Sequence, residues 1–354
     1  MKHVKRAGAL TLAAALSLSM ALPAGAASYT VQECDSLWKI AQEQLGSGTQ
    51  WGQIYEANKS TIRNPNLIYV GQQLTIPETE QTRSNPNTNT GKEELTMTNI
   101  EKATALIRTF ATGDTETAAR LLDENYIQHN LAYGTGEAAF LDSVEYLASA
   151  PVKTTVNNIR AFEDGDYVFL QTVYNFAGAG EQVAFDIFRF DEDGEIAEHW
   201  DNLAPLADQP NPSGRTQIDG ALEITDLDKT EENRQLVQNF LYDVMQGHNP
   251  DKTADYFDGD TYLQHNTAIA DGVSGLNAAL TALAEQGIQM IYNETHLVLA
   301  QGNYVLAVSE GTYGGAPTSY YDLWRVENGK IAEHWDVMET IADPSTWQNS
   351  NGKF

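Results

Sequence analysis

The chain has 354 residues, more than one ordinary hydrophobic core accommodates, so its length predicts two or three domains. Asp and Glu total 49 against 21 Lys and Arg, which gives a net charge of -28. A surface of that charge repels phosphate groups, so nucleic acid and anionic membranes are not expected partners.

Residues 1–27 have the organisation of a signal peptide. Basic residues precede an apolar run over residues 7–22, and small residues follow at 23–27. Because the run is short and is interrupted by Ser17 and Ser19, we favour cleavage after Ala26 or Ala27 over a membrane anchor. We therefore expect a secreted protein, at the cell wall or in the extracellular space, with no membrane contact after cleavage.

Residues 28–78 predict a small domain with the order strand, helix, helix, strand. Alternation over residues 29–32 indicates the first strand, and residues 73–77 indicate the returning one. Between them, Asp35-Ser36 offers a helix N-cap, and helical spacing of apolar residues predicts one helix from Leu37 and another from Trp51.

These residues resemble a LysM domain over its whole length. The resemblance implies that the domain binds N-acetylglucosamine-containing glycans such as peptidoglycan, in a groove between the loop before the first helix and the loop after the second. The implied groove residues are Asp35, Ser36, Leu37, Pro65, Asn66, Leu67 and Ile68. The family usually has Gly where this chain has Cys34, its only cysteine, and if that position has positive φ the substitution costs about 1–2 kcal/mol.

The rest of the chain contains an internal repeat. Residues 79–96 read as a flexible linker, because the stretch 79–91 has no large apolar side chain to bury. Four motifs then recur at offsets of 135 to 137 residues, which predicts two copies of one domain at 97–207 and 227–343. Between the copies, residues 208–226 read as a connector, and residues 344–354 form a tail. The recurring motifs are 126–130 with 262–266, 165–168 with 302–305, 186–190 with 322–326, and 196–201 with 331–336.

Each copy has the α+β order, with amphipathic helices first, then strands, then a closing hairpin. Pairing Phe190 with Glu195 across the turn places Asp186 opposite His199. The equivalent pairing in the second copy places Asp322 opposite His334. Alternation then predicts Asp186, Phe188, Ala197, His199 and Asp201 on one face, and Ile187, Arg189, Ile196, Glu198 and Trp200 on the other.

Both copies resemble the SnoaL-like group of the nuclear-transport-factor-2-like superfamily. The motifs that carry the resemblance are Tyr-x-Gln-His-Asn, Asp-x-[Phe/Trp]-Arg and Glu-His-Trp-Asp. It implies a curved antiparallel sheet wrapped into a cone around a small, largely apolar ligand. In some members a carboxylate and a His act as acid and base in aldol-type cyclisation. The residues implied are His129, Asp186, His199 and Asp201 in copy 1, and His265, Asp322, His334 and Asp336 in copy 2. The chain departs from the family at Leu131 and Thr267, where Pro is common, and at Gln171 and Val308, where many relatives have His.

The Asp–His pairs admit another interpretation, in which they only tie the hairpin together and His129 bonds to the pair across the mouth of the cone. Arg189 with Glu198, and Arg325 with Glu333, are expected to form ion pairs on the opposite face. The separations along the chain are long and no short metal motif exists, so we expect neither a metal nor another cofactor.

The two copies are expected to pack as an intramolecular pseudo-dimer through their outer sheet faces. The residues predicted to build this contact are Ile187, Ile196 and Trp200 with Leu323, Ile331 and Trp335. A connector of about twenty residues is long enough to allow it.

Three functions remain open from the sequence. The favoured one is an exported, wall-associated protein whose LysM domain binds peptidoglycan and whose cones bind a small apolar ligand. The second is an exported acid–base enzyme of the aldol, cyclase or lyase type. The third is a structural surface protein with inactive pockets.

Overall fold

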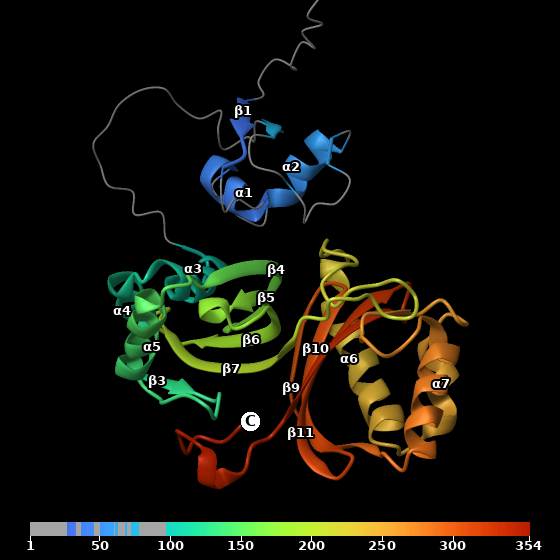
Figure 1. Cartoon of the computed structure of the whole chain (residues 1–354). Helices are drawn as coiled ribbons and strands as arrows, with labels where there is room; N and C mark the ends of the chain where they lie inside the picture. Colours follow the sequence, from blue (N-terminus) through green and yellow to red (C-terminus); the bar gives the residue numbers. More distant parts are fainter. Residues whose placement is uncertain are drawn as a thin grey trace, which may run out of the picture. The chain divides into compact units, whose positions relative to one another are not determined.

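The computed structural model describes residues 27–32, 37–45, 50–59, 61–62, 68, 72–77 and 97–354. The chain divides into two compact units, residues 1–89 and 90–354, which are described separately (Figure 1). The expected signal peptide lies outside the described residues, apart from Ala27, as do Cys34 and the whole linker at 79–96.

The first unit has the order β1 (Ala27–Thr30), α1 (Leu37–Leu45), α2 (Trp51–Asn58) and β2 (Gln73–Ile76), as the sequence predicts. The two strands pair antiparallel, and the helices bury Ile40, Ala41 and Ile54 against them. The side-chain amide of Asn58 donates to Thr75 O at 2.7 Å and accepts from Thr75 N at 2.8 Å. This pairing joins α2 to β2, which matters in a core so small.

Copy 1 occupies the first half of the second unit. Its helices are α3 (Asn99–Thr112), α4 (Thr115–Leu121) and α5 (Glu137–Ser149). Its sheet has the order β3-β7-β6-β5-β4, with β3 parallel to β7 and the other pairs antiparallel. The strands are β3 (Leu122–Gln128), β4 (Thr155–Asp164), β5 (Tyr167–Asn175), β6 (Gln182–Phe190) and β7 (Ile196–Pro205), and a short 3₁₀ turn, η3 (Phe176–Gly178), follows β5.

Copy 2 repeats this topology, with sheet order β8-β12-β11-β10-β9. Its strands are β8 (Leu263–Gln264), β9 (Met290–Gln301), β10 (Tyr304–Tyr313), β11 (Ala316–Glu327) and β12 (Lys330–Thr340). Its helices are α6 (Thr230–Phe240) and α7 (Gly272–Glu285), and its short helical turns are η4 (Leu227–Lys229), η5 (Leu241–Met245), η6 (Pro250–Tyr256) and η7 (Pro344–Thr346). The α+β fold class expected for both copies is confirmed.

The closing hairpin has a different register from the one expected. Asp186 pairs with Asp201 and Phe188 with His199, whereas the sequence predicted Asp186 opposite His199. One residue of the shift comes from the turn, in which Asp191 N donates to Glu195 O, and one comes from a bulge between Arg189 and Phe190. A shift of two residues keeps every side chain beyond the bulge on its predicted face. Copy 2 has the same shift, with Asp322 opposite Asp336.

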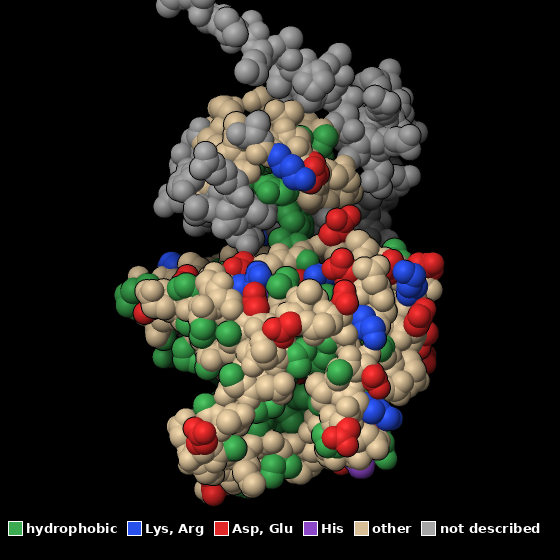
Figure 2. All heavy atoms as spheres, turned by 90° about the vertical axis from the view of Figure 1, so that its right-hand side faces the viewer, with side chains coloured by type: hydrophobic (Ala, Val, Ile, Leu, Met, Phe, Trp, Pro, Cys, Tyr) green, Lys and Arg blue, Asp and Glu red, His purple; other side chains and the backbone are tan. Residues whose placement is uncertain are grey.

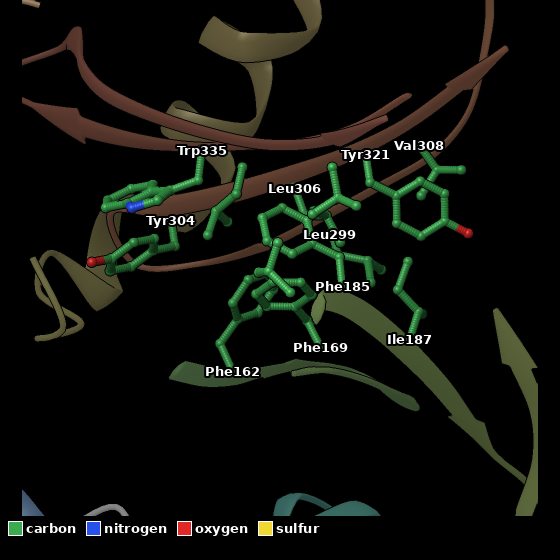
Figure 3. Close-up of a cluster of buried hydrophobic side chains, with 13 residues drawn as sticks. Phe162, Phe169, Phe185, Ile187, Leu299, Tyr304, Leu306, Val308, Tyr321 and Trp335 are labelled. Atoms are coloured by element: carbon green, nitrogen blue, oxygen red, sulfur yellow. The ribbon is translucent and has the colours of Figure 1, made fainter. Parts of the chain in front are cut away.

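The outer faces of the two sheets share one buried hydrophobic cluster. In Figure 3, Phe169, Phe185 and Ile187 of copy 1 point toward side chains of copy 2, including Leu306 and Trp335. In Figure 1 the helices of the two copies accordingly lie on opposite sides of the pair of sheets. The full cluster contains Phe162, Phe169, Val183, Phe185, Ile187, Leu299, Tyr304, Leu306, Val308, Tyr321, Leu323, Trp335 and Val337.

Two residues expected in this contact lie elsewhere. Ile331 packs with Val237 and Phe240, on the side of the sheet that faces the helices of copy 2. Its counterpart Ile196 pairs with Phe190, beyond the bulge. Because the bulge reverses the alternation at this point, the prediction that Ile196 and Ile331 face the other copy was wrong.

The segments that follow the two sheets cross over between the copies. The C-terminal residues 348–352 contact residues 128–135 of copy 1, at the end of β3 and just after it, and Figure 1 shows the C-terminus near this strand. Asn349 donates to Asn130 O and Tyr133 O, each at 2.9 Å. The connector makes the equivalent contacts with copy 2. Its Asn211 side chain donates to Asn266 O at 3.3 Å and to Ile269 O at 3.0 Å.

These two segments are themselves repeated in sequence. Asn211-Pro-Ser-Gly-Arg215 matches Asn349-Ser-Asn-Gly-Lys353, and in each the Asn side chain also accepts from the backbone N–H two residues later. The tail and the connector are therefore equivalent parts of the two copies, each bound to the other copy.

Removing the connector amide should destabilise the second unit. Asn211 is 5% exposed, and its side-chain N–H groups reach three backbone carbonyls, including Gln264 O at 2.6 Å. We expect Asn211→Ala to lower the free energy of unfolding by about 1–3 kcal/mol, because those carbonyls lose their partner. Urea unfolding followed by tryptophan fluorescence measures the change. The exposed Ser350→Ala is the control, with an expected change within about 0.5 kcal/mol, and equal effects of the two variants would contradict the prediction.

Candidate functional site

Copy 1 encloses a cavity of about 330 Å³ between its sheet and its helices. Most of the lining is apolar or aromatic, with polar groups concentrated at the inner face of β6 and β7. The lining residues are Ile107, Phe110, Tyr126, Gln128, Asn130, Ala132, Tyr133, Gly134, Ala139, Phe140, Ser143, Leu147, Tyr174, Phe176, Gln182, Asp186, Phe188, His199, Asp201, Leu203 and Glu339. Three of the four residues expected to form the site in copy 1, Asp186, His199 and Asp201, meet in this cavity.

Gln128 fixes the orientation of His199. The Gln128 carbonyl Oε1 accepts from Asn130 N at 2.8 Å, and its amide Nε2 donates to the Tyr126 hydroxyl at 3.1 Å. With Oε1 held as an acceptor, the contact of 3.1 Å from His199 Nδ1 must be a donation by the imidazole. The imidazole therefore carries a proton on Nδ1, and its other nitrogen, Nε2, points toward Asp186.

His199 Nε2 lies 3.2 Å from Asp186 Oδ1. The other carboxylate oxygen, Oδ2, accepts from the Tyr174 hydroxyl at 3.0 Å. Burial raises the pKa of Asp186, while its hydrogen bond to His199 and the charge of that imidazole act in the opposite direction. The pair therefore places a buried imidazole nitrogen against a desolvated carboxylate.

Asp201 completes the group. Its Oδ2 accepts from Asn130 Nδ2 at 2.9 Å, whereas its Oδ1 is buried and has no hydrogen-bond partner. The residue is 7% exposed and belongs to the lining of the cavity, so the free oxygen is shielded from bulk solvent. A buried carboxylate oxygen without a partner is costly, which marks it as a point where a ligand would bind.

His129 lies on the opposite face of the sheet, so its predicted place beside the Asp–His pair was wrong. It stacks on Trp200 with ring centroids 4.7 Å apart, and its Nε2 lies 2.8 Å from Glu198 Oε1. Its Nδ1 donates to Gly352 O of the tail at 2.9 Å. Alternation along β3 explains the error, because Gln128 points inward and the next residue must point outward.

His265 has the same position in copy 2 and is also excluded from the inner face. Its Nε2 lies 2.9 Å from Glu333 Oε1, and its Nδ1 lies 2.7 Å from both Thr216 O and Asp219 Oδ1 of the connector. On this face the expected ion pairs are present, with Arg189 and Glu198 2.7 Å apart and Arg325 and Glu333 also 2.7 Å apart.

The inner network of copy 2 repeats that of copy 1. His334 lies 3.1 Å from Gln264 Oε1 and 2.9 Å from Asp322 Oδ1. Burial raises the pKa of Asp336, although His334 opposes this shift. The tyrosine that donates to Asp322 is Tyr292 of β9, at 3.1 Å, whereas copy 1 uses β5 for this purpose.

Larger side chains occupy the inner face of copy 2. Tyr320 and Trp324 stand at the positions of Ala184 and Phe188, and they are 0% and 1% exposed. The ring of Tyr320 stacks on Tyr292 at 4.2 Å. The two copies therefore share a polar network but differ in the side chains around it.

Copy 2 also contributes to the cavity of copy 1. Glu339 of β12 lies in its lining and forms an ion pair of 3.1 Å with Lys353. The Lys353 amine is buried and also donates to Asp201 O at 2.7 Å. Burial raises the pKa of Glu339, with Lys353 acting against the shift.

Sequence reasoning missed Gln128, Asn130, Tyr174 and Glu339. Period-two alternation through Tyr126-Ile-Gln-His-Asn130 could have indicated the first two, since Gln128 and Asn130 share the inner face with Tyr126. Nothing in the sequence brings Glu339 to the other copy.

Of the expected glycan groove, only Leu37 and Ile68 lie within the described residues. Leu37 is 3% exposed and belongs to the core of the first unit. Ile68 is partly buried against the same core. Asp35, Ser36, Pro65, Asn66 and Leu67 lie outside the described residues.

Family comparisons agree with these two folds. The model of the SnoaL-like domain matches residues 103–199 and 237–334, together more than half of the chain. The chain belongs to the SnoaL-like family. The model of the LysM domain matches residues 29–77, so the first unit carries a LysM domain.

Two curated relatives resemble a short stretch of the chain. The potassium binding protein Kbp of Escherichia coli is 42% identical over 59 residues, which is 16% of this chain and 40% of that protein. The resuscitation-promoting factor Rpf of Micrococcus luteus is 42% identical over 53 residues, which is 15% of this chain and 23% of that protein. The chain thus spans less than half the length of either relative.

Solved structures with similarity to this SnoaL-like protein include an NTF2-like protein of unknown function from Cytophaga hutchinsonii. It is 19% identical, covers 32% of this chain and 95% of its own, and has a TM-score of 0.28. TsrD from Streptomyces laurentii is 18% identical, covers 31% of this chain and 91% of its own, and has a TM-score of 0.27.

Within the described part of the chain, no helix combines the length and apolar character needed to cross a membrane. On the face drawn in Figure 2, acidic side chains of the second unit are scattered among neutral ones and do not gather in one patch.

The His265 site predicts a pH-dependent stability. Burial disfavours its charged form, but hydrogen bonds to Asp219 and Glu333 outweigh this and raise the pKa of His265 above its ordinary value. The folded state then holds a proton that the unfolded state releases above a pH of about 6.5. The stabilisation is complete below that pH and is lost as the pH rises through the raised pKa. Thermal melting between pH 6 and pH 9 measures this loss.

The variant His265→Gln should lower the pH dependence in that window. The exposed His248→Gln removes one imidazole elsewhere and should leave it unchanged. A His265→Gln variant with the slope of the wild type would contradict the assignment.

Proposed function

We propose that this protein is exported and attaches to the cell wall through its LysM domain, and that its first SnoaL-like copy binds a small, largely apolar ligand. The observation that carries the proposal is the cavity of about 330 Å³ in copy 1. Ligand sites are concave and mostly apolar, with a few convergent polar groups, and their volumes start at about 300 Å³. Phe110, Phe140 and Leu147 supply the apolar wall, and the Asp186–His199 pair and Asp201 supply the polar end.

In this proposal the two copies have different tasks within one pseudo-dimer. Copy 1 holds the ligand, and copy 2 supports it by the shared hydrophobic cluster and by supplying Glu339 to the cavity. The bulky Tyr320 and Trp324 on the inner face of copy 2 support this division.

Filling the cavity should block the ligand. Ser143 of α5 lines it, and Ser143→Leu adds apolar volume there. We expect the affinity for the apolar fluorescent probe N-phenyl-1-naphthylamine to fall at least about tenfold, which corresponds to about 1.4 kcal/mol. The matched control is Ala279→Leu, at the equivalent position of α7 in copy 2, which should bind the probe as the wild type does.

Probe binding that is unchanged in Ser143→Leu, or lost equally in both variants, would count against copy 1 as the binding domain. Native mass spectrometry of the secreted protein provides the natural ligand, if one co-purifies. N-terminal sequencing of the same sample tests export, because cleavage is expected after Ala26 or Ala27.

The wall attachment is tested by sedimentation with insoluble peptidoglycan. A full-length variant with Asp35→Ala and Asn66→Ala should sediment less than the wild type, because both residues belong to the glycan groove implied by the LysM resemblance. Soluble N-acetylglucosamine oligomers should release the wild-type protein. Sedimentation of the double variant equal to that of the wild type would remove this groove from the proposal, while Ser143→Leu should sediment normally.

A further inference from the structure

The polar end of the cavity in copy 1 has the arrangement of a metal site. One ligand atom from each of Asp186, His199 and Asp201 lies within 4.8 Å of the others, and all three residues are buried. The separation along the sequence had argued against a metal, but the hairpin of β6 and β7 brings the three residues onto one inner face. Strand pairing joins these residues although they are distant in sequence.

Each residue of the group is held from its outer side. Tyr174 donates to Asp186 Oδ2, Asn130 donates to Asp201 Oδ2, and His199 donates from Nδ1 to Gln128 Oε1. Metal-binding histidines usually donate their second ring N–H in this way, and metal-binding carboxylates are usually hydrogen-bonded on the outside. The remaining atoms are Asp201 Oδ1, which has no partner, and the pair Asp186 Oδ1 and His199 Nε2, whose contact with each other a bound ion would replace.

Asp201 Oδ1 supplies the independent sign of a missing ligand. It is buried without a hydrogen-bond partner in a residue that is 93% buried, and the residue lines the cavity. A carboxylate oxygen in such a place requires a cation or a donor. Asp186 Oδ1 and His199 Nε2 are 3.2 Å apart, a separation that two neighbouring ligands of one ion can have.

The geometry points to a divalent transition-metal site, of the Zn²⁺ class, made by Asp186, His199 and Asp201. Two carboxylates and one imidazole suit Zn²⁺ and similar ions, and three protein ligands leave a coordination position open to a molecule in the cavity. The inference rests on the proposed function, since the ion would anchor the polar end of the cavity ligand.

Copy 2 offers a comparison within the same chain. Asp322, His334 and Asp336 do not form a group at that separation in the described chain, and Asp322 Oδ1 lies closer to its imidazole, at 2.9 Å. We therefore place the site in copy 1 alone.

The test is isothermal titration of ZnCl₂ into the full-length protein after treatment with EDTA. Two other groups, which are less buried, could also hold a metal ion. One is Glu294 with His296 and Glu310, and the other is Asp123 with Asp191 and Glu195. All measurements therefore use a His296→Gln, Glu195→Gln background. We expect one saturable Zn²⁺ per chain, lost in Asp201→Asn and in His199→Gln.

Two further variants sharpen the result. Tyr174→Phe removes only the donor to Asp186 Oδ2 and should weaken Zn²⁺ binding about 10–100-fold. The matched control, His334→Gln with Asp336→Asn in copy 2, should bind Zn²⁺ as the background does. Circular dichroism and melting temperature identify any variant that fails to fold, and Asp201→Asn is isosteric so that folding is preserved.

The metal site is overturned if the background protein binds no Zn²⁺, or if Asp201→Asn binds it with unchanged affinity. Binding of N-phenyl-1-naphthylamine to the same EDTA-treated protein separates this failure from that of the proposed function. Probe binding without Zn²⁺ binding refutes the metal site alone. Zn²⁺ binding without probe binding refutes the apolar ligand and leaves the metal site.

Discussion

Each SnoaL-like copy has a Gln-His-Asn segment whose backbone carbonyls and outward imidazole form hydrogen bonds with a segment that extends from the other copy. This extension is the tail for copy 1 and the connector for copy 2. Asn349 and Gly352 serve this purpose for copy 1, and Asn211 and Thr216 serve it for copy 2. Buried polar groups without partners are costly, so neither copy can separate without exposing or orphaning these groups. The same segment carries Gln128, which fixes the imidazole of His199. The geometry of the cavity thus depends on a segment more than two hundred residues away in the chain.

This exchange explains why the two copies belong to one chain. Two folded copies that each hold the other's extension form a closed pair, and the hydrophobic cluster between the sheets adds the apolar contact. The connector links the two copies and also binds copy 2, through Asn211 to Gln264 O and through Arg215 to Asp271. The LysM domain is a separate compact unit with its own hydrophobic core.

Period-two alternation and the internal repeat predicted the duplication and half of the site, whereas the curved sheet was expected only from the resemblance to the SnoaL-like group. They placed Asp186, His199 and Asp201 on one face, because a register shift of two residues leaves faces unchanged. They failed for Ile196, where a bulge reverses the alternation, since no sequence signal marks the bulge. They failed for His129 because the motif was treated as a unit, although alternate residues of a strand must face opposite sides. The exchange of the connector and the tail between the copies was not predicted, although the motif Asn-x-x-Gly followed by a basic residue recurs in both segments.

The duplication also shows that a polar network can be retained while the side chains around it change. Both copies retain the Asp, the His and the Gln that fixes its ring. The inner face around it has changed, because Ala184 and Phe188 of copy 1 correspond to Tyr320 and Trp324 in copy 2. The tyrosine that reaches the Asp has also moved to a different strand, β9 in place of β5. A shared network therefore cannot by itself indicate function, and within the described residues the unpartnered buried oxygen of Asp201, beside the cavity, distinguishes copy 1.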